Sequence, residues 1–282
     1  MLGRVFLLLL LASCSLPVLA QSERDMRAQA QASMVVSGMV DIEPDGSVSA
    51  YELDHRDELP PYVADVIDKA VPGWRFAPVM VDGVTVPARA RMGVRLVAAR
   101  AGIDGVEVTI RSASFGAYDE GDTGSVGVVS RKPPSYPTTA ALLYASSDVY
   151  VVLKIGRAGE VLDVAVEQVN LRSAANGTKS ERLRTLFSKA AVEAARKWVF
   201  RPPTTGDQAD APYWSATTMI SFVMQGEPVH DYGRWIAYIP GPRQMAPWLR
   251  EADHNANDAL AAGTIQQLGT GPRLLTRLQP ET

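Results

Sequence analysis

The stretch RKWVFRPP, Arg196 to Pro203, follows an alanine-rich segment, and GWRFAPV, Gly73 to Val79, repeats its Trp-x-Phe-x-Pro pattern in the first half of the chain. Before the later copy, apolar residues recur at the three- and four-residue spacing of one helix face, and this stripe ends at Trp198. The stripe consists of Leu183, Leu186, Phe187, Ala190, Ala191, Ala194, Ala195 and Trp198. Because the two prolines cannot continue a helix, the motif predicts a helix end followed by an extended return. We interpret its aromatic side chains as core packing against a sheet and not as ligand contacts.

The residues on either side of this helix have the pattern of β-strands. Two predicted strands, Val149 to Ile155 and Val161 to Val169, precede the helix and are joined by the turn GRAGE, Gly156 to Glu160. A last predicted strand, Tyr213 to Met224, follows the helix. The expected order is therefore strand, strand, helix, strand.

The first half of the chain repeats this order with a different sequence. Predicted strands at Ser33 to Ile42 and Val48 to Leu53 flank a Pro-Asp-Gly turn, and a third strand is predicted at Thr85 to Val97. A short helix is expected between the second and third strands, because apolar residues again recur at helical spacing. They are Val63, Val66, Ile67, Ala70 and Val71.

The sequence thus predicts an α+β fold of two tandem small units, each with the order strand, strand, helix, strand. Each unit has a turn glycine and, later, the aromatic motif. These signature residues are Gly46, Trp74, Phe76 and Pro78 in the first unit and Gly159, Trp198, Phe200 and Pro202 in the second.

The boundaries follow from these patterns. We expect a signal peptide at 1–20, the first unit at 21–100, a linker at 101–133, the second unit at 134–225 and a C-terminal tail at 226–282. One extra strand is predicted in the linker, at Val106 to Ile110. The tail is expected to pack on the second unit and to continue as a helix near Trp248 to Leu260, and a dedicated partner site for its aromatic residues is the alternative.

The first twenty residues, MLGRVFLLLLLASCSLPVLA, have the features of a secretory signal peptide: a basic residue at Arg4, an apolar run and a Val-x-Ala ending at Ala20. The apolar run is too short for a membrane-spanning helix, which needs about 20 apolar residues. The alternative is a lipoprotein, because LASC resembles a lipobox and would anchor the chain through Cys14. Cleavage near Ala20 would leave a mature chain without cysteine, and therefore without disulfides or thiolate chemistry.

Composition and motifs argue against several classes of function. The chain has 282 residues, 46% of them hydrophobic, and a net charge of -3 without a run of like charges, so no nucleic-acid partner is expected. It has three isolated histidines and none of the common catalytic or nucleotide-binding motifs. We interpret Asp253, His254 and Asp258 as a solvated helix face. We therefore predict no enzyme activity, no catalytic residue, no metal and no cofactor; a hydrolase would need a pocket around His230 or His254.

The pattern Tyr136-Pro137, strand, GRAGEVLDV, a helix ending in AARKWVFRPP and a closing strand resembles the C-terminal domain of TonB, the periplasmic energy transducer of Gram-negative bacteria. The resemblance is best over Pro134 to Met224 and weaker over Val35 to Val97, which has no Tyr-Pro. It implies a periplasmic unit that binds the extended TonB box of an outer-membrane transporter along a sheet edge. The uncleaved membrane helix and long proline-rich spacer of TonB are not seen, so the resemblance does not carry over energy transduction.

Transferred by position, the resemblance implies a peptide site at the Tyr-Pro pair and along the last strand of the second unit. The candidate residues are Tyr136, Pro137, Ser215, Thr217, Met219, Ser221 and Val223. Because the last strand follows others that are consecutive, we expect it at an edge with unpaired backbone groups. The expected partner is an envelope protein or the peptide of a TonB-dependent transporter. The alternative is a structural envelope protein whose sheet edges are covered by its own tail.

Overall fold

The computed structural model of the chain describes residues 29–102, 105–116, 122–173, 177–249, 259–260 and 263–278. The predicted signal peptide with Cys14 and Ala20, and the residues Asp253, His254 and Asp258, lie outside these ranges. The described residues form a mixed α+β fold with antiparallel sheets. Within them, no helix is long and apolar enough to cross a membrane.

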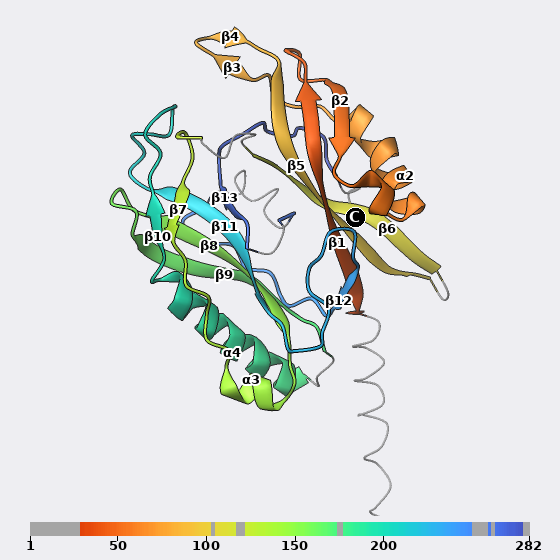
Figure 1. Ribbon diagram of the computed structural model, residues 1–282, viewed down its shortest axis with the longest axis vertical. Coiled ribbons are helices and arrows are strands. Elements are labelled where there is room, and N and C mark those ends of the chain that lie inside the picture. The colour runs from red at the N-terminus through yellow and green to blue at the C-terminus, as the bar shows by residue number, and fades with distance from the viewer. Residues whose placement is uncertain are drawn as a thin grey trace, which may run out of the picture.

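The first half forms one antiparallel sheet around strand β1. β2 pairs with the second half of β1, β5 pairs with β1 along nearly its whole length, and β6 pairs with the other side of β5. A β3–β4 hairpin projects from this half (Figure 1). The elements are β1 (Gln31–Ile42), β2 (Val48–Leu53), η1 (Arg56–Glu58), α2 (Pro61–Ala70), η2 (Val71–Gly73), β3 (Met80–Val81), β4 (Val84–Thr85), β5 (Ala88–Ala101) and β6 (Gly105–Gly116).

The second half has the same arrangement around strand β8. β9 and β11 pair with the two sides of β8, and α4 connects β9 to the return strand β10. The elements are β7 (Gly127–Ser130), α3 (Thr138–Leu142), β8 (Ser147–Ile155), β9 (Val161–Leu171), α4 (Gly177–Ala195), β10 (Val199–Arg201) and β11 (Trp214–Phe222). In both halves the first strand lies between the second and the third, and the helix precedes the third strand. The predicted order strand, strand, helix, strand is therefore present in each half.

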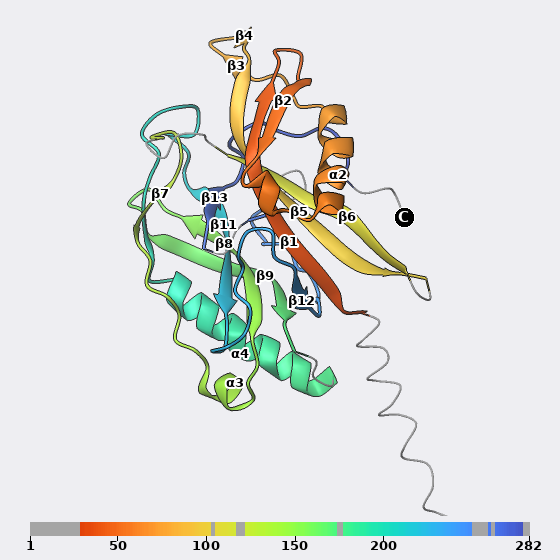
Figure 2. The ribbon, with the colours of Figure 1, turned by 45° about the vertical axis from the view of Figure 1, so that its right-hand side comes forward.

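The two helices lie on the outer sides of the two sheets, as Figures 1 and 2 show for α2 and α4. Each helix and the inner strands enclose a separate apolar core. The sheet faces that carry no helix turn toward each other. Arg95 of β5 is buried there, with its guanidinium 5.1 Å from the ring centre of Tyr150 on β8 and 5.5 Å from that of Tyr238 in the tail. This cation–π contact links the two halves and the tail.

The aromatic motif of each half is held by the turn between its first two strands. The backbone N–H of Phe76 donates to the carbonyl of Gly46, and that of Phe200 donates to the carbonyl of Gly159, both at 2.8 Å. The two glycines have φ angles of 83° and 84°. A methyl carbon would lie 2.0 Å from the Phe76 oxygen at the first glycine and 1.9 Å from the Phe200 oxygen at the second. Only glycine permits this approach, because it lacks Cβ and tolerates positive φ.

The side chains of the two motifs lie as expected for core residues. Trp74, Phe76, Trp198 and Phe200 are at most 3% exposed. The indole N–H of Trp198 donates to a backbone carbonyl at 2.8 Å, which satisfies its one polar atom. Helix α4 ends just before this residue, and β10 contains Phe200. The predicted end at Trp198 therefore lies three residues beyond the observed end at Ala195.

The linker contributes strands to both halves. The strand predicted at Val106 to Ile110 is confirmed and is longer, since β6 extends to Gly116 and pairs with β5 along its length. β7 pairs with β10 of the second half. Of the range 101–133, the strands Gly105–Gly116 and Gly127–Ser130 thus belong to the folded units and are not a simple spacer.

The tail packs on the second unit, as predicted, and it also packs on the first half. β12 (Ile236–Tyr238) pairs with β1, and Ile239 bridges to Leu171 at the end of β9. Farther along, β13 (Ile265–Gln267) pairs with β11. The tail returns to the first half where Leu274 bridges to Phe76. Of the helix predicted near 248–260, only 248–249 and 259–260 are described, and they are not helical.

The close approach at the turn glycines gives a testable prediction. Gly159→Ala should lower the free energy of unfolding by at least about 2 kcal/mol, because left-handed φ costs a side chain about 1–2 kcal/mol and the methyl group also meets the Phe200 carbonyl. Gly206→Ala is the matched control, since Gly206 has φ 78° but no atom within 4 Å of the added carbon. Chemical denaturation measures both. Equal losses in the two variants would contradict the role assigned to the close approach.

Candidate functional site at the outer edge of strand β11

Strand β11 was expected at a sheet edge, but the chain's own tail covers that edge. The register pairs Ala216 with Gln267, Thr217 with Gln266 and Thr218 with Ile265. On either side of β13, Leu268 donates its N–H to the carbonyl of Ser215 at 2.7 Å, and Gly263 donates to that of Met219 at 3.2 Å. The expectation of a free edge is therefore wrong over 215–219. The segment 263–268, with the strand β13 at its centre, occupies the position in which a peptide was expected.

The side chains of the predicted peptide-binding residues point into the protein. Thr217 is fully buried and Met219 is 2% exposed. Ser215 and Ser221 are half-buried in β11, and Val223 lies just beyond the end of this strand. These residues lie on the face of the sheet that carries no helix, beneath the first half and the tail. A ligand at this edge would contact the backbone and not these side chains.

Tyr136 lies close to the end of β11, but within the second core. Its ring packs edge-to-face against Phe187 and Phe222, with centroid distances of 6.0 and 5.8 Å. Its hydroxyl donates to the carbonyl of Ala145 at 2.6 Å, and burial raises its pKa. Pro137 precedes the first residue of α3. The Tyr-Pro pair therefore shapes the chain entry into the second half.

The fit between β11 and β13 leaves polar atoms without partners. Among the described residues, Thr218 Oγ1, Gln266 Oε1 and Gln267 Nε2 are buried and have no hydrogen-bond partner within the protein. The other amide atoms are satisfied, since Gln267 Oε1 accepts from Val126 N at 2.7 Å and Gln266 Nε2 donates to Phe115 O at 3.1 Å. Each buried polar atom without a partner costs about 1–3 kcal/mol. The tail segment is thus held by backbone hydrogen bonds and by one hydrogen bond from each glutamine side chain, while the other polar atom of each glutamine amide has no partner within the protein.

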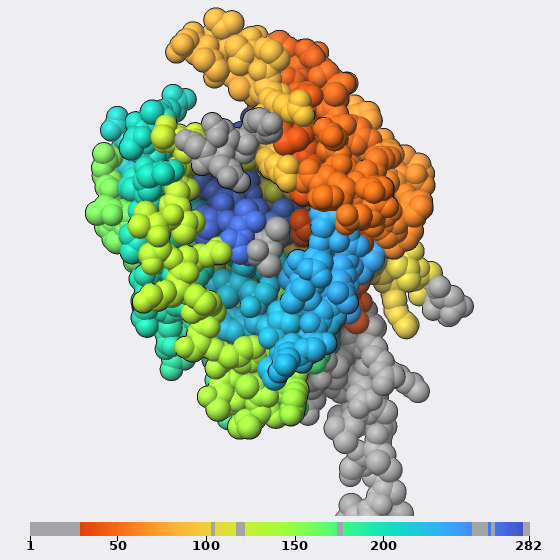
Figure 3. Space-filling model, viewed as in Figure 1, coloured from red at the N-terminus to blue at the C-terminus, as the bar shows by residue number. Residues whose placement is uncertain are grey.

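A cavity of about 350 Å³ lies beside β13, between the tail and the uncovered face of the first sheet. Its lining includes Ser37, Arg91 and Ser114 from the sheet, and His230 and Gln266 from the tail. Figure 3 shows part of the tail, in blue, set back between the two halves. Because one side of β13 faces this cavity, the segment is less closely packed than a core strand.

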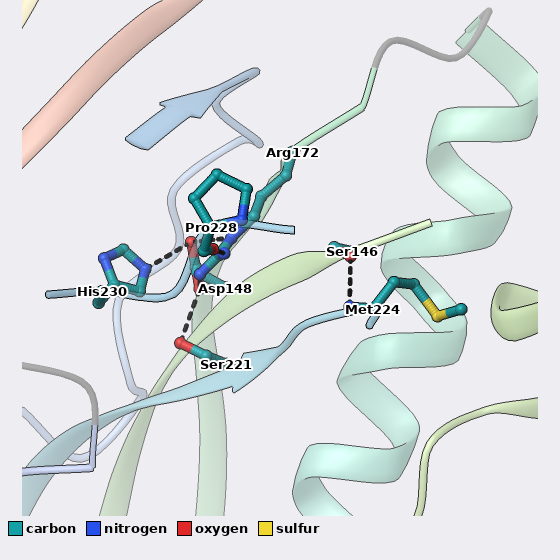
Figure 4. A network of polar contacts seen from close by, with 7 residues as sticks. All are labelled: Ser146, Asp148, Arg172, Ser221, Met224, Pro228 and His230. Atoms are coloured by element: carbon teal, nitrogen blue, oxygen red, sulfur yellow. Dashed lines mark hydrogen bonds and ion pairs between the residues drawn. The ribbon is translucent and has the colours of Figure 1, made fainter. Parts of the chain in front are cut away.

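The start of the tail is held in place by a buried carboxylate, Asp148, at the start of β8. Asp148 accepts hydrogen bonds from Arg172 Nη2 at 2.7 Å and Nε at 3.1 Å, and from Ser221 Oγ at 2.7 Å (Figure 4). His230 Nε2 lies 3.0 Å from Asp148 Oδ2, an ion-pair distance when the imidazole is protonated. Arg172 also donates to the carbonyl of Pro228 at 2.6 Å. The network joins three strand ends to the first residues after β11.

Burial alone would raise the pKa of Asp148, because it disfavours the charged form. The contacts with His230 and Arg172 act in the opposite direction and lower the pKa to about 2. The side chains of Asp148 and Arg172 are each 4% exposed. This pair is therefore an internal charge pair that screening by salt affects little.

The Ser221, Asp148 and His230 side chains contain the groups of a catalytic triad in a different geometry. Ser221 donates to the carboxylate and not to the imidazole, so the arrangement lacks the contact by which a histidine activates a nucleophile. In the part of the chain that the structure describes, no group of three His, Cys, Asp or Glu side chains is placed to hold a metal ion. The cavity reaches His230, as a hydrolase would require, but no activated nucleophile in the described ranges accompanies it.

Asp148 and Arg172 were not among the predicted site residues. The sequence does contain a signal for them, because each is a charged residue that flanks an apolar strand: Asp148 precedes Val149 to Ile155 and Arg172 follows Val161 to Leu171. Their partnership depends on the pairing of β8 with β9, which the sequence pattern does not specify.

Comparisons of the chain with protein-family models and with curated proteins give no match. The resemblance to the TonB C-terminal domain therefore rests on the motif residues and on the element order of the second half.

The buried carboxylate gives a prediction on stability and pH. Asp148→Asn should destabilise the protein by roughly 3–5 kcal/mol at neutral pH, because it leaves the Arg172 charge buried without a carboxylate. The folded-state pKa of about 2 lies below the ordinary value of 3.8, so this stabilisation is present above about pH 4 and is lost as the pH falls toward 2. The difference between wild type and variant should therefore narrow by about 2 kcal/mol over this interval.

Denaturation curves at several pH values measure this difference. Ser221→Ala serves as the control, because it removes one hydrogen bond worth about 1 kcal/mol and leaves the acid dependence in place. A stability difference between the wild type and the Asp148→Asn variant that stays constant from neutral pH to strongly acidic pH would contradict the assignment. Such a result would mean that Asp148 titrates equally in the folded and unfolded states.

Proposed function

We propose that the protein is a non-enzymatic binding protein of the cell envelope, built from two units related to the TonB C-terminal domain. Its ligand is an extended peptide segment added to the outer edge of β11. The partner is an envelope protein or the peptide of a TonB-dependent outer-membrane transporter, and the protein acts in the periplasm. No metal, cofactor or nucleic acid takes part.

The pairing of β11 with residues 263–268 carries this proposal. A segment from a distant part of the sequence lies along β11 and donates main-chain hydrogen bonds there, to Ser215 and Met219. Strand addition of this kind takes its affinity from backbone groups, so it requires no conspicuous set of surface side chains. The edge is thus competent to hold an extended segment, and an external peptide would use the same groups.

A structural envelope protein is the second candidate, and the same pairing favours it. If the tail permanently covers the edge, β13 serves to protect an aggregation-prone strand and to join the two halves. The two candidates differ in one respect that can be measured: whether weakening β13 creates a peptide site.

Gln266→Pro separates the two candidates. Proline lacks the N–H that Gln266 can donate toward its register partner Thr217, so the substitution weakens β13 on β11. We expect the variant to bind N-terminal peptides of outer-membrane transporters at least about 10-fold more tightly than the wild type, because the internal competitor is weakened. Backbone amide shifts in a peptide titration of the full chain measure the binding, and they should concentrate at 215–219.

Gln266→Ala is the matched control, since it removes the side-chain amide but keeps the backbone N–H. It should bind peptide more weakly than the proline variant. If neither variant shows amide shifts at millimolar peptide, the peptide-binding proposal is wrong and the structural role stands.

A further inference from the structure

We infer that residues 263–268 are an exchangeable internal ligand, which leaves the edge of β11 while both halves stay folded and so controls access to that edge. This inference rests on the proposed function, because it names the regulation of the same site. The competing ligand is an extended peptide whose backbone replaces that of β13.

The two halves cover the equivalent edge in very different ways. In the first half the third strand is β5, and β6 pairs with it from Arg91 to Ala101 as the next strand of a long hairpin. In the second half the third strand is β11, and β13 has only 3 residues and comes from the far end of the chain. β6 is therefore part of the first unit. β13 is not part of the second unit, so it can leave while all the strands of that unit stay in place.

The segment is bounded by positions that can act as hinges. Gly263 and Gly269 have φ angles of 82° and 76°. An added carbon at Gly269 would have no atom within 4 Å, so little tertiary packing holds the backbone there. Glycine allows large changes of φ and ψ at low cost. At Gly263 the backbone is held by two hydrogen bonds, one from its N–H to Met219 O and one from Arg131 to its carbonyl, so release of the segment must break both. Once they are broken, the segment 263–269 is able to swing as one piece between fixed points.

The fixed points lie outside the segment and do not depend on it. Before it, β12 pairs with β1, and Ile239 bridges to Leu171. After it, Leu275 N donates to the carbonyl of Arg75 at 2.7 Å. Release of β13 therefore leaves the tail attached to both halves. Because it remains tethered, β13 returns at a high effective concentration and is a strong competitor even if its own pairing is weak.

The contacts of β13 are also poor for a permanent strand. Its junction with β11 contains the three buried polar atoms without partners described above, and its inner side faces the cavity of about 350 Å³. Release exposes these atoms to water, which satisfies them. An incoming peptide with small or apolar side chains at the equivalent positions avoids the same penalty. The side chains at the contact between β11 and β13 thus favour replacement of β13 by another segment over permanent pairing.

Hydrogen exchange in the full-length wild type tests the inference without a ligand. We expect the amides of Gln266 and Leu268 to exchange at least about 100-fold faster than amides that pair β8 with β9, through a local opening that low denaturant does not accelerate. Equal protection of β13 and the β8–β9 pairs would overturn the inference, because release would then require unfolding of the whole protein.

A disulfide across β11 and β13 provides the locked control. Thr218 and Ile265 are register partners. The backbone hydrogen bonds are made by the adjacent pairs, so these two residues form a non-hydrogen-bonded pair. In such a pair the side chains lie close enough for a disulfide. The disulfide is made in the full chain with Cys14→Ser, Thr218→Cys and Ile265→Cys. In the oxidised protein the amide of Gln266 should be protected from exchange as strongly as the amides of β8. After reduction of the disulfide this added protection should disappear. Protection that does not respond to reduction would contradict local opening.

A synthetic peptide with the sequence of residues 263–269, GTIQQLG, is the probe for exchange. It should bind the Gln266→Pro protein and not the oxidised, locked protein. Binding to the locked protein would place the peptide elsewhere and overturn the inference. Fast exchange of β13 without binding of this peptide or of transporter peptides would contradict the proposed function alone. Peptide binding to Gln266→Pro together with slow exchange of wild-type β13 would contradict this inference alone.

Discussion

The backbone contact between a turn glycine and the phenylalanine of the aromatic motif organises each half of the protein. The hydrogen bonds from Phe76 to Gly46 and from Phe200 to Gly159 close the helix exit onto the turn that joins the first two strands. The paired tryptophan and phenylalanine then fall into the core between helix and sheet. The contact leaves no space for a Cβ atom on the turn glycine. One local contact therefore fixes together the turn, the end of the helix and the core position of the two aromatic side chains. This explains why the same short motif occurs twice in one chain.

The two halves share this constraint but treat their edges differently. Both present a third strand whose outer side could pair with another segment. β6 covers that side in the first half as part of the unit, and β13 covers it in the second half as a short strand from the tail. Unpaired strand edges attract other chains, so each half needs some cover. A short cover with imperfect side-chain fit protects the edge at rest and can still give way to a competing segment.

Charged groups hold the tail and the halves together where the uncovered sheet faces meet. Asp148 binds Arg172 and lies against His230, and Arg95 lies near the rings of Tyr150 and Tyr238. Buried charges of this kind require their partners, because an isolated charge in the interior is very costly. They therefore specify how the halves and the start of the tail are placed. Because these contacts do not involve β13, this strand can leave its edge while they stay in place.

Local rules were sufficient to predict much of the fold. Helical periodicity, turn glycines and prolines located α2, α4 and the strands around them, because these signals depend on neighbours in the sequence. The candidate site was not predictable in the same way. That Asp148 meets Arg172 depends on the pairing of β8 with β9, and that β11 is covered depends on where a much later segment returns. Strand pairing uses backbone groups that nearly every residue carries, so the sequence of β11 alone cannot reveal its neighbour. The sequence by itself determined the two units and their cores, and only the tertiary structure decided which edge is occupied and by what.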